Sequence, residues 1–594
     1  MKRLSKPRVI AIVQARMGST RLPGKVLQSI AGKALLWHVF YRLEKSRTID
    51  ESVLAISNNP IDNPIKEWAD SQGIRVFRGS EHNLLERYHF TAKQTEADVI
   101  VRITGDAPLV DPSIIDQLVE VLLNDDRIDY ATASPGQKCI HEGFNPFTRR
   151  SLSRLMQEAS DNPVAREHVT AFFEGNPDFA AIGYIDITRE HQFEGARLSV
   201  DTPSDIIFME KIHQELNSAA GEIDIADLVK LLKAKPEILE INQHVRQKGA
   251  EEIGKSIIIR CDGDEAIGLG HAYRMLSLAE ILRDQYSYAI RFAVQSGPAA
   301  ITLFAENYFN VDIIAPNDSE EDSIIKMISE FSPAAIVFDV RSDLSASAIA
   351  RWKNGGVVCL VYDDASSRRL SASLAIYPPV PQVMKLSWEG FEGKLMVGFK
   401  FALLRSQFSK NKLEAQNLVP RIFISMGGAD PHNLVFLVCD ALSLVRQEFV
   451  ADIVIGRAFE SHAELTEVLT QAPFKYELHH NIEDISSLMI TAKLGVVTFG
   501  MVAYELGALG VHALHIGITP DHVESSSIFS KQGMANNLGL FTNLTDSKLA
   551  NTIEIGLSQG KNIQSPMKED HLDGLGATRV AQLLNDEILA VRSK

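Results

Sequence analysis

The stretch RVIAIVQARMGSTRLPGK, residues 8–25, decides the fold of the first part of the chain. Its apolar run, Val9 to Val13, leads straight into a turn of small residues, as a buried strand does where it meets a ligand. Backbone N–H groups exposed at residues 18–20 can surround a polyphosphate, and three basic residues add positive charge: Arg16, Arg21 and Lys25. The GxxxxGK(S/T) pattern of a Walker A loop is absent, so spacing alone fits a phosphate loop and a basic surface turn equally well.

Short β-branched runs alternate with amphipathic helical stretches along almost the whole chain. The strands expected in the first part are residues 8–13, 52–57, 74–77, 98–103, 130–134 and 180–185. The helices expected between or after them are residues 35–45, 64–72, 114–123 and 151–159. This alternation predicts an α/β fold with a mostly parallel, doubly wound, Rossmann-like sheet.

The alternation of expected strands and helices begins again at residues 256–283, SIIIRCDGDEAIGLGHAYRMLSLAEILR. A charged segment precedes it, and RSQFSKNKLEAQNLVP, residues 405–420, looks like a second linker. We therefore expect one α/β domain, a linker and two further α/β lobes. The predicted bounds are 1–245 for the domain, 246–255 for the linker, and 256–410 and 418–594 for the lobes.

Composition narrows the class of protein. The 594 residues carry a net charge of −16, which argues against a general nucleic-acid binder. No run approaches the about 18 apolar residues that a membrane span needs, and the N-terminal apolar run is too short for a signal peptide. The four cysteines, at 139, 261, 359 and 439, are too far apart for a zinc site and fit a reducing compartment. The sequence predicts an acidic, cytoplasmic, multidomain protein.

Two aspartates follow expected strands of the first domain. Asp106 lies in ITGDAPLVDP and Asp201 in RLSVDTPSD. Carboxylates at the carboxyl ends of parallel strands can together hold Mg²⁺ on a triphosphate, because Mg²⁺ prefers few carboxylates plus phosphate oxygens. Taken separately, either residue also fits a turn or a helix cap.

The order of AIVQARMGSTRLPGK, FRGSEHNLLERY, RITGDAPLVDP, REHVT and RLSVDTPSD resembles the acylneuraminate and spore-coat-polysaccharide cytidylyltransferases, over residues 8–245. The resemblance implies a nucleotidyltransferase that joins CTP to an acidic sugar and releases pyrophosphate. It implies that Arg16, Ser19, Arg21 and Lys25 hold the triphosphate, with Arg16 and Lys25 catalytic, and that Asp106 and Asp201 bind Mg²⁺. It places Arg87 and residues 166–168 near the nucleotide or sugar. One departure is the segment 143–147, GFNPF, which lacks the family's acidic residue in the sugar pocket.

The start of the second part carries a histidine at a helix N-terminus. Gly268 and Gly270 permit close approach of a ligand, and His271 and Arg274 share one helix face. A helix N-terminus disfavours imidazolium, so His271 can stay neutral and accept a proton from water. A histidine that only caps or packs at the turn remains the alternative.

Two further segments combine a strand, a glycine turn and a helix start: 424–434, ISMGGADPHNL, and 494–510, LGVVTFGMVAYELGALG. This arrangement is the usual geometry for receiving a diphosphate. Glu505, one turn into its helix, can accept hydrogen bonds from ribose hydroxyls or be a solvated helix carboxylate.

These pieces, with LLRSQF at 403–408, resemble the UDP-sugar hydrolase of pseudaminic-acid biosynthesis, which has the two-lobed glycosyltransferase-B fold. The resemblance implies that His271 positions or activates water at the anomeric carbon, with Arg274 nearby and no cofactor. It also implies nucleotide contacts from Gly427, Gly428, Asn433 and Glu505. The chain departs from that family at residues 339–341, at Phe499 and at Asp521-His522.

The two resemblances together predict a bifunctional enzyme for a CMP-activated nonulosonic acid, of the pseudaminic or legionaminic type, that feeds surface glycans. Its expected partners are CTP, an acidic sugar and a UDP-sugar, with Mg²⁺ in the first domain, no nucleic acid and no membrane span. A second copy of the chain is a further candidate partner. One alternative joins an active cytidylyltransferase to a glycosyltransferase-like module. The other joins it to a nucleotide-sugar sensor or scaffold that does not turn over.

Overall fold

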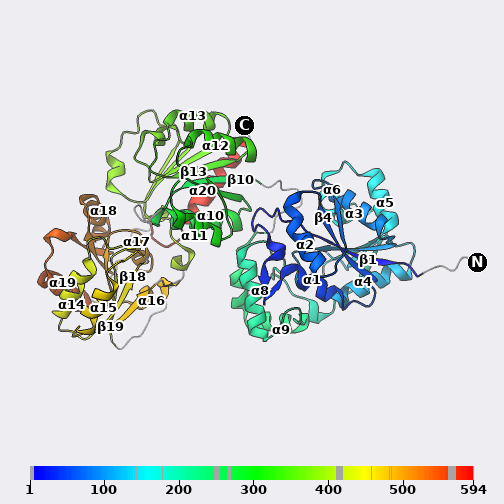
Figure 1. The fold of residues 1–594 in the computed structure, drawn as a ribbon, viewed down its shortest axis with the longest axis horizontal. Helices are drawn as coiled ribbons and strands as arrows, with labels where there is room; N and C mark the ends of the chain where they lie inside the picture. Colours follow the sequence, from blue (N-terminus) through cyan, green and yellow to red (C-terminus); the bar gives the residue numbers. More distant parts are fainter. Residues whose placement is uncertain are drawn as a thin grey trace, which may run out of the picture. The chain divides into compact units, whose positions relative to one another are not determined.

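The computed structural model describes residues 6–137, 140, 144–176, 178–246, 255–263, 269–409, 419–456, 458–480, 482, 484–558 and 570–592. Contacts divide the chain into two compact units (Figure 1). Unit 1 is built mainly from residues 1–254 and unit 2 mainly from residues 255–594. Most of the expected linker 246–255 lies outside the described residues, and the predicted domain bounds stay predictions.

Unit 1 is built on a seven-stranded sheet in the order β5-β4-β1-β6-β8-β7-β9. Its strands are β1 (Val9–Gln14), β4 (Glu51–Ser57), β5 (Val76–Gly79), β6 (Val99–Thr104), β7 (Tyr130–Ala133), β8 (Pro146–Thr148) and β9 (Ile182–Ile185). All described pairings are parallel except those of β8, which runs antiparallel to β6 and β7. The predicted α/β fold with a mostly parallel sheet is therefore confirmed.

Helices cover both faces of this sheet. They are α1 (Leu35–Leu43), α2 (Asn63–Ser71), α3 (Leu84–Gln94), α4 (Pro112–Asn124), α5 (Arg149–Glu158), α6 (Pro163–Glu167), α7 (Val169–Gly175), α8 (Pro203–Leu216) and α9 (Ile225–Ala234). Side chains of β1 alternate between two cores, with Val9 and Ala11 in one and Ile10 and Ile12 in the other. Burial on both faces explains why this strand is an unbroken apolar run.

Unit 2 contains two sheets with parallel pairings throughout the described registers. The first lobe has the order β12-β11-β10-β13-β14-β15-β16. Its strands are β10 (Ser256–Cys261), β11 (Ala289–Val294), β12 (Asn310–Ile313), β13 (Ala335–Asp339), β14 (Val358–Tyr362), β15 (Leu374–Tyr377) and β16 (Lys394–Val397). Its helices are α10 (Gly270–Asp284), α11 (Pro298–Glu306), α12 (Glu320–Phe331) and α13 (Ala346–Asn354).

The second lobe has the order β19-β18-β17-β20-β21-β22. Its strands are β17 (Arg421–Ser425), β18 (Val450–Ile455), β19 (Lys475–His480), β20 (Leu494–Thr498), β21 (Ala513–Gly517) and β22 (Ala535–Leu540). Its helices are α14 (Leu434–Ser443), α15 (His462–Thr470), α16 (Ile485–Thr491), α17 (Met501–Ala508), α18 (Pro520–Lys531) and α19 (Asp546–Ser558). The predicted two-lobed α/β arrangement of this part is confirmed.

The last helix, α20 (Gly576–Arg592), returns to the first lobe, where it packs against α10 and β14 (red in Figure 1). The first lobe is thus built from two separate stretches of the chain. The start of the expected linker 405–420 is structured, because Ser406–Ser409 form a short helix, η8, with Phe408 buried. Among the described residues, no helix combines the length and the hydrophobicity that crossing a lipid bilayer requires.

Candidate active sites

The loop after β1 is held in shape by a buried carboxylate. Asp62, only 1% exposed, accepts hydrogen bonds from the backbone N–H groups of Met17 (2.7 Å) and Ser57 (3.1 Å). Gly24 has φ +67°, a left-handed conformation that favours glycine. The N–H of Ser19 donates to the carbonyl of Met17 (2.8 Å), so it is already used inside the loop. The loop therefore has a fixed shape, and Arg16 is exposed on it.

Lys25 joins the two predicted magnesium ligands. Its Nζ lies 2.5 Å from Asp106 Oδ2 and 2.6 Å from Asp201 Oδ1. Burial opposes the charge on this lysine, but the two carboxylates outweigh burial and raise the pKa of Lys25. Residues that lie 81 and 176 positions from Lys25 in the sequence are thus brought into one site.

Backbone geometry brings the two carboxylates together. The N–H of Gly105 donates to the carbonyl of Gln14 (2.8 Å), and a Cβ at position 105 would lie 2.8 Å from the same oxygen. Only glycine therefore lets the ends of β1 and β6 approach this closely, immediately before Asp106. The buried Asp205 accepts hydrogen bonds from the N–H groups of Asp201 (2.8 Å) and Thr202 (2.9 Å), which fixes the backbone of Asp201 at the start of α8.

Two arginines complete the charge around Asp201. Arg21 Nη2 lies 2.9 Å from Asp201 Oδ2, and Arg197 bonds to the same oxygen while its Nε donates to Asp205 (3.0 Å). Burial would raise the pKa of Asp201, but Lys25, Arg21 and Arg197 together lower it below its usual value. Asp201 is therefore ionised. Arg197 and Asp205 are partners that the sequence analysis missed.

The two aspartates fit a divalent cation. Asp106 Oδ2 and Asp201 Oδ1 converge on a single cationic atom, Lys25 Nζ, from two different chain segments. Carboxylate oxygens are the donors that Mg²⁺ prefers, and Mg²⁺ takes its other ligands from phosphate and water. The chemistry and the convergence of these oxygens therefore suit the expected metal.

Three further arginines of unit 1 lie on α3, β6 and α6; they are Arg87, Arg102 and Arg166. Arg87 donates from Nη2 (2.6 Å) and Nε (3.1 Å) to the carbonyl of Ser80, so its guanidinium holds the chain before α3. Arg102, on β6, is 7% exposed, and Arg166 lies on α6. The Nε atoms of Arg102 and Arg166 are buried without a hydrogen-bond partner among the described residues. Arg102 was missed, although an arginine inside the apolar run VIVRI is the signal that could have identified it.

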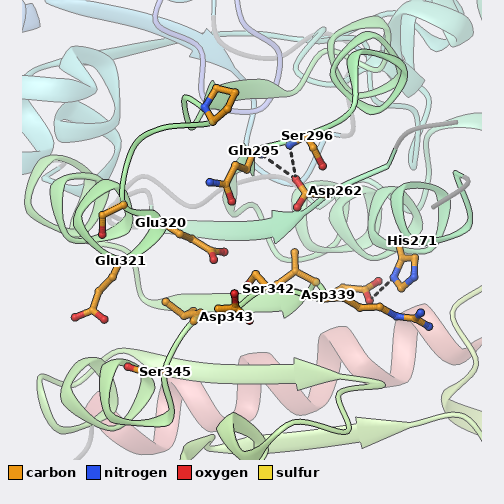
Figure 2. A pocket seen from close by; sticks show the side chains of 15 residues that line it. Asp262, His271, Gln295, Ser296, Glu320, Glu321, Asp339, Ser342, Asp343 and Ser345 are labelled. Carbon is orange, nitrogen blue, oxygen red and sulfur yellow. Dashed lines mark hydrogen bonds and ion pairs between the residues drawn. The ribbon is translucent and has the colours of Figure 1, made fainter. Parts of the chain in front are cut away.

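In unit 2, His271 pairs with an aspartate at the end of a strand (Figure 2). Asp339, 2% exposed, has Oδ1 2.7 Å from His271 Nδ1, and it accepts from Arg274 Nε at Oδ2 (2.6 Å). Burial alone would raise the pKa of Asp339, but Arg274 and His271 lower it to about 2. An ionised carboxylate only accepts hydrogen bonds, so the contact with Asp339 favours the tautomer with its proton on Nδ1, in which Nε2 is the acceptor; Arg274 Nη2, itself a donor, also lies 3.0 Å from Nδ1.

The glycine turns of the second lobe differ from each other. At the start of α14, the N–H groups of Leu434 and Val435 donate to the carboxylate of Asp430 (2.8 and 2.9 Å). Asp430 thus takes N–H groups that were expected to receive a diphosphate. The turn itself contains Gly427 at φ +91°, Gly428, and Asn433 in a left-handed conformation. The start of α17, after Gly500, has no side-chain cap from the described residues.

Glu505 is buried rather than solvated. Its Oε1 accepts from Arg405 Nη2 (3.1 Å), in the LLRSQF segment, and burial raises its pKa. The solvated-carboxylate alternative is therefore wrong. Gly268 and Gly143 lie outside the described residues.

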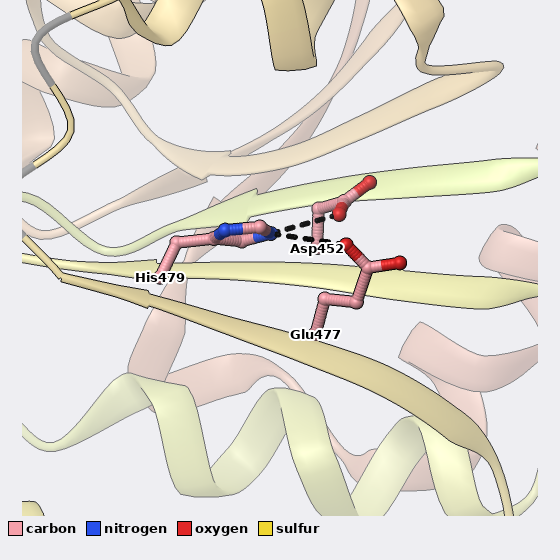
Figure 3. Close-up of side chains that lie close together, drawn as sticks. All are labelled: Asp452, Glu477 and His479. Carbon is pink, nitrogen blue, oxygen red and sulfur yellow. Dashed lines mark hydrogen bonds and ion pairs between the residues drawn. The ribbon is translucent and has the colours of Figure 1, made fainter.

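A further group of acidic and histidine side chains lies in the second lobe (Figure 3). His479 Nε2 is 2.9 Å from Asp452 Oδ1 and 3.9 Å from Glu477 Oε2. Arg421 already holds both oxygens of the buried Asp452, at 2.7 and 2.5 Å. Arg421 begins β17, at the sheet edge opposite the strand carboxyl ends. This group is a structural ion-pair network.

Comparison with known proteins relates the site in unit 1 to a family. A family model described as "Cytidylyltransferase" matches residues 10–228. The spore coat polysaccharide biosynthesis protein SpsF of Bacillus subtilis is 31% identical over 237 residues, which are 39% of this chain and 95% of that protein. The 3-deoxy-manno-octulosonate cytidylyltransferase of Trichlorobacter lovleyi is 31% identical over 139 residues, 23% of this chain and 54% of that protein. The crystal structure of Acinetobacter baumannii MurG is similar at 13% identity with a TM-score of 0.43, and the match covers 56% of this chain and all of that one. Through unit 1, this chain belongs to the cytidylyltransferase family.

Proposed function

We propose that unit 1 transfers CMP from CTP to a hydroxyl of an acidic sugar and releases pyrophosphate. The observation that carries the proposal is the convergence of Lys25, Asp106 and Asp201 beside the loop after β1. This arrangement joins positive charge for a triphosphate to two carboxylates that suit Mg²⁺. The sugar that we propose is a nonulosonic acid of the pseudaminic or legionaminic type.

The chain's own residues act mainly by positioning and charge. Arg16, Ser19 and Lys25 bind the triphosphate, and Arg21 keeps Asp201 ionised and oriented. The sugar hydroxyl attacks the α-phosphorus, the bond to the β-phosphate breaks, and the hydroxyl proton passes to solvent. Mg²⁺, when held by Asp106 and Asp201, neutralises phosphate charge.

Two arginines support an acidic sugar. Arg102 is buried and donates from Nη1 to Thr170 Oγ1 (3.5 Å), and Arg166 is half-buried; the Nε of each is buried without a partner among the described residues, and a buried N–H is costly unless an acceptor meets it. A sugar carboxylate supplies two acceptor oxygens in the plane that a guanidinium prefers. We therefore place the acid group of the sugar beside Arg102 and Arg166.

Pyrophosphate release tests this proposal. The full chain is incubated with CTP, Mg²⁺ and a nonulosonic acid, and Asp106→Asn is compared with the exposed Asp161→Asn as the matched control. We expect sugar-dependent pyrophosphate from the wild type and from the control, and a loss of about 100-fold or more in Asp106→Asn. Equal activity in all three proteins would contradict the proposal.

A second candidate function belongs to unit 2 and is favoured by the pair His271–Asp339. Here Nε2 of His271 takes a proton from water, the water oxygen attacks the anomeric carbon of a UDP-linked amino sugar, and UDP leaves. UDP release is measured for His271→Ala against the exposed His462→Ala. Release that persists in His271→Ala excludes this role. Release that needs a sugar acceptor points instead to a glycosyltransferase-like module.

A further inference from the structure

The side chain of Lys25 holds the two carboxylate oxygens that suit a divalent cation. Its Nζ lies 2.5 Å from Asp106 Oδ2 and 2.6 Å from Asp201 Oδ1, and within the described part of the chain it has no other partner. A lysine ammonium is a compact point charge, so it can gather carboxylates around one atom as a metal ion does. Lys25 and a divalent cation therefore compete for the same two oxygens.

The other oxygen of Asp201 is held in a different way. Arg21 Nη2 lies 2.9 Å from Oδ2, and Arg197 bonds to the same atom. Each arginine has a second anchor. Arg21 Nη1 donates to the carbonyl of Arg246 (3.0 Å). Arg197 Nε donates to Asp205 Oδ1 (3.0 Å). The two oxygens of Asp201 are thus divided, with the lysine on Oδ1 and the two arginines on Oδ2.

Buried partners keep Arg197 in place. Asp205 is 0% exposed and Asn242 is 1% exposed. The side-chain amide of Asn242 donates to Asp205 Oδ1 (3.0 Å) and to the backbone carbonyl of Arg197 (3.1 Å). Moving Arg197 away would leave the buried charge of Asp205 uncompensated, which is costly. Arg197 therefore stays on Oδ2 when ligands enter the site.

The side chain of Lys25 can move while its backbone stays in place. The backbone begins the short helix η1 (Lys25–Leu27), where its N–H donates to the carbonyl of Leu22 (3.2 Å) and its carbonyl accepts from the N–H of Gln28 (3.0 Å). A lysine carries its charge on a flexible four-carbon stem, so the ammonium can change direction without unfolding the loop. A bound triphosphate gives this ammonium new anionic acceptors in exchange for the two carboxylates.

We propose that Lys25 takes the place of the divalent cation in the nucleotide-free enzyme and gives up that place when CTP binds. The side chain then passes from the carboxylates to the triphosphate, and Asp106 Oδ2 and Asp201 Oδ1 become available to the cation. Arg21 and Arg197 remain on Oδ2 and keep the carboxylate of Asp201 oriented. The cation is therefore bound with the nucleotide or after it. The inference rests on the cytidylyl transfer proposed for unit 1, because it assigns CTP and the cation to this site.

Mn²⁺ binding to the nucleotide-free full chain tests the exchange. Mn²⁺ is the probe because the sharp electron paramagnetic resonance signal of the free ion is lost on binding. We expect weak binding by the wild type. In Lys25→Met we expect binding at least about tenfold tighter, because the ion no longer has to displace the lysine. Lys25→Gln is the second variant, since its amide can still donate to a carboxylate and so preserve the fold, and circular dichroism verifies both.

Addition of CTP tests the second half of the proposal. At saturating CTP, and after subtraction of the Mn²⁺ that CTP binds alone, the difference between the wild type and Lys25→Met disappears, because the nucleotide has already drawn the lysine away. No acidic sugar is present in either experiment and no turnover is needed. A failure of cytidylyl transfer and a failure of this proposal are therefore separate results.

Further variants separate displacement of the lysine from a change of charge. Arg21→Met removes the same charge from Asp201 but leaves Lys25 on Oδ1, so Mn²⁺ binding tightens by at most about threefold. Asp106→Asn added to Lys25→Met abolishes the gain, which locates the ion at the two carboxylates. Lys33→Met, at an exposed position, is the control. The proposal is overturned by micromolar Mn²⁺ binding to the nucleotide-free wild type, by equal affinity in Lys25→Met, by an equal gain in Arg21→Met, or by a difference that persists at saturating CTP.

Discussion

The two candidate sites belong to two different sheets, and their central charges have opposite signs. In unit 1 a cation, Lys25, is held between the carboxylates of Asp106 and Asp201. In unit 2 a carboxylate, Asp339, is held between Arg274 and His271. Asp106 follows β6 and Asp339 ends β13, whereas Asp201 lies just before α8. The fold therefore decides where a ligand binds, and the residues decide its charge and chemistry.

These charge arrangements favour different chemistry in the two units. The basic loop of unit 1 suits the triphosphate of CTP, with the carboxylates suited to Mg²⁺. In unit 2, the contact with Asp339 favours a proton on Nδ1 of His271, and Nε2 is then the acceptor. If the two sites act independently, a substitution in one unit abolishes the activity of that unit and leaves the activity of the other unchanged.

The largest effect is expected for Lys25→Met. Removing the cation leaves two carboxylates facing a triphosphate, so cytidylyl transfer falls about 1,000-fold. The control is Lys33→Met, an exposed lysine, and circular dichroism verifies folding. Transfer that stays within tenfold of the wild type, or an equal loss of UDP release by unit 2, would contradict separate roles for the two sites.

Asp339→Asn is the matching change in unit 2. An amide no longer fixes the proton on Nδ1 of His271, so UDP-sugar hydrolysis falls about 100-fold in kcat while cytidylyl transfer is unchanged. The pH dependence also changes, because the base has lost its ionised partner. Asp318→Asn, at an exposed position, is the control. An unchanged kcat and pH profile would show that Asp339 only packs against α10.

Arg102→Gln tests whether Arg102 contacts the acidic sugar or the nucleotide in unit 1. Loss of the buried guanidinium raises KM for the acidic sugar about tenfold and leaves KM for CTP unchanged, because the nucleotide contacts other residues. Steady-state kinetics with each substrate varied in turn separates the two. A rise in KM for CTP alone would place Arg102 on the nucleotide side.

Arg421→Met tests the ion-pair network that Arg421 and His479 form with Asp452 and Glu477 in the second lobe of unit 2. Asp452 is fully buried and loses both hydrogen bonds from Arg421, so the free energy of unfolding falls by about 3 kcal/mol. Neither activity changes beyond what lower stability explains. Denaturant unfolding measures the effect, and an unchanged midpoint would contradict a structural role for this network.

The smallest effect is a pH dependence of stability. The pKa of Asp339 is lowered from 3.8 to about 2, so its ion pairs stabilise unit 2 above about pH 4 and this contribution is lost as the pH falls toward 2. Asp339→Asn removes that part of the acid dependence. Unfolding curves of the wild type and of Asp339→Asn, measured between pH 4.5 and 2.5, give the difference. Parallel curves would show that the pair contributes no pH-dependent stability.

Sequence patterns predicted the architecture because its central strands are buried on both faces and read as unbroken apolar runs, as β1 does. They missed β8, because three residues that begin with Pro146 carry no alternation and become a strand only by pairing with β6.

The predicted residues Asp106 and Asp201 were found together around Lys25, but only Asp106 follows a strand, β6; the strand expected before Asp201 does not form among the described residues, and Asp201 lies just before α8. Their partners were not predictable, because the contacts join distant segments: Asp339 lies 68 residues from His271, and Asp62 lies 45 residues from Met17. Asp430 shows that a residue can be visible in the sequence while its role is not. The quoted segment contained it, but only its hydrogen bonds to Leu434 and Val435 reveal that it occupies the helix start.

The most direct test of the central claim is mass-spectrometric detection of a CMP-sugar after incubation of the full chain with CTP, Mg²⁺ and a panel of nonulosonic acids. We expect a CMP-linked product with at least one member of the panel, and we expect Asp106→Asn to abolish it. Folded protein that binds CTP and yields no CMP-linked product with any member would contradict the proposed acidic-sugar substrate.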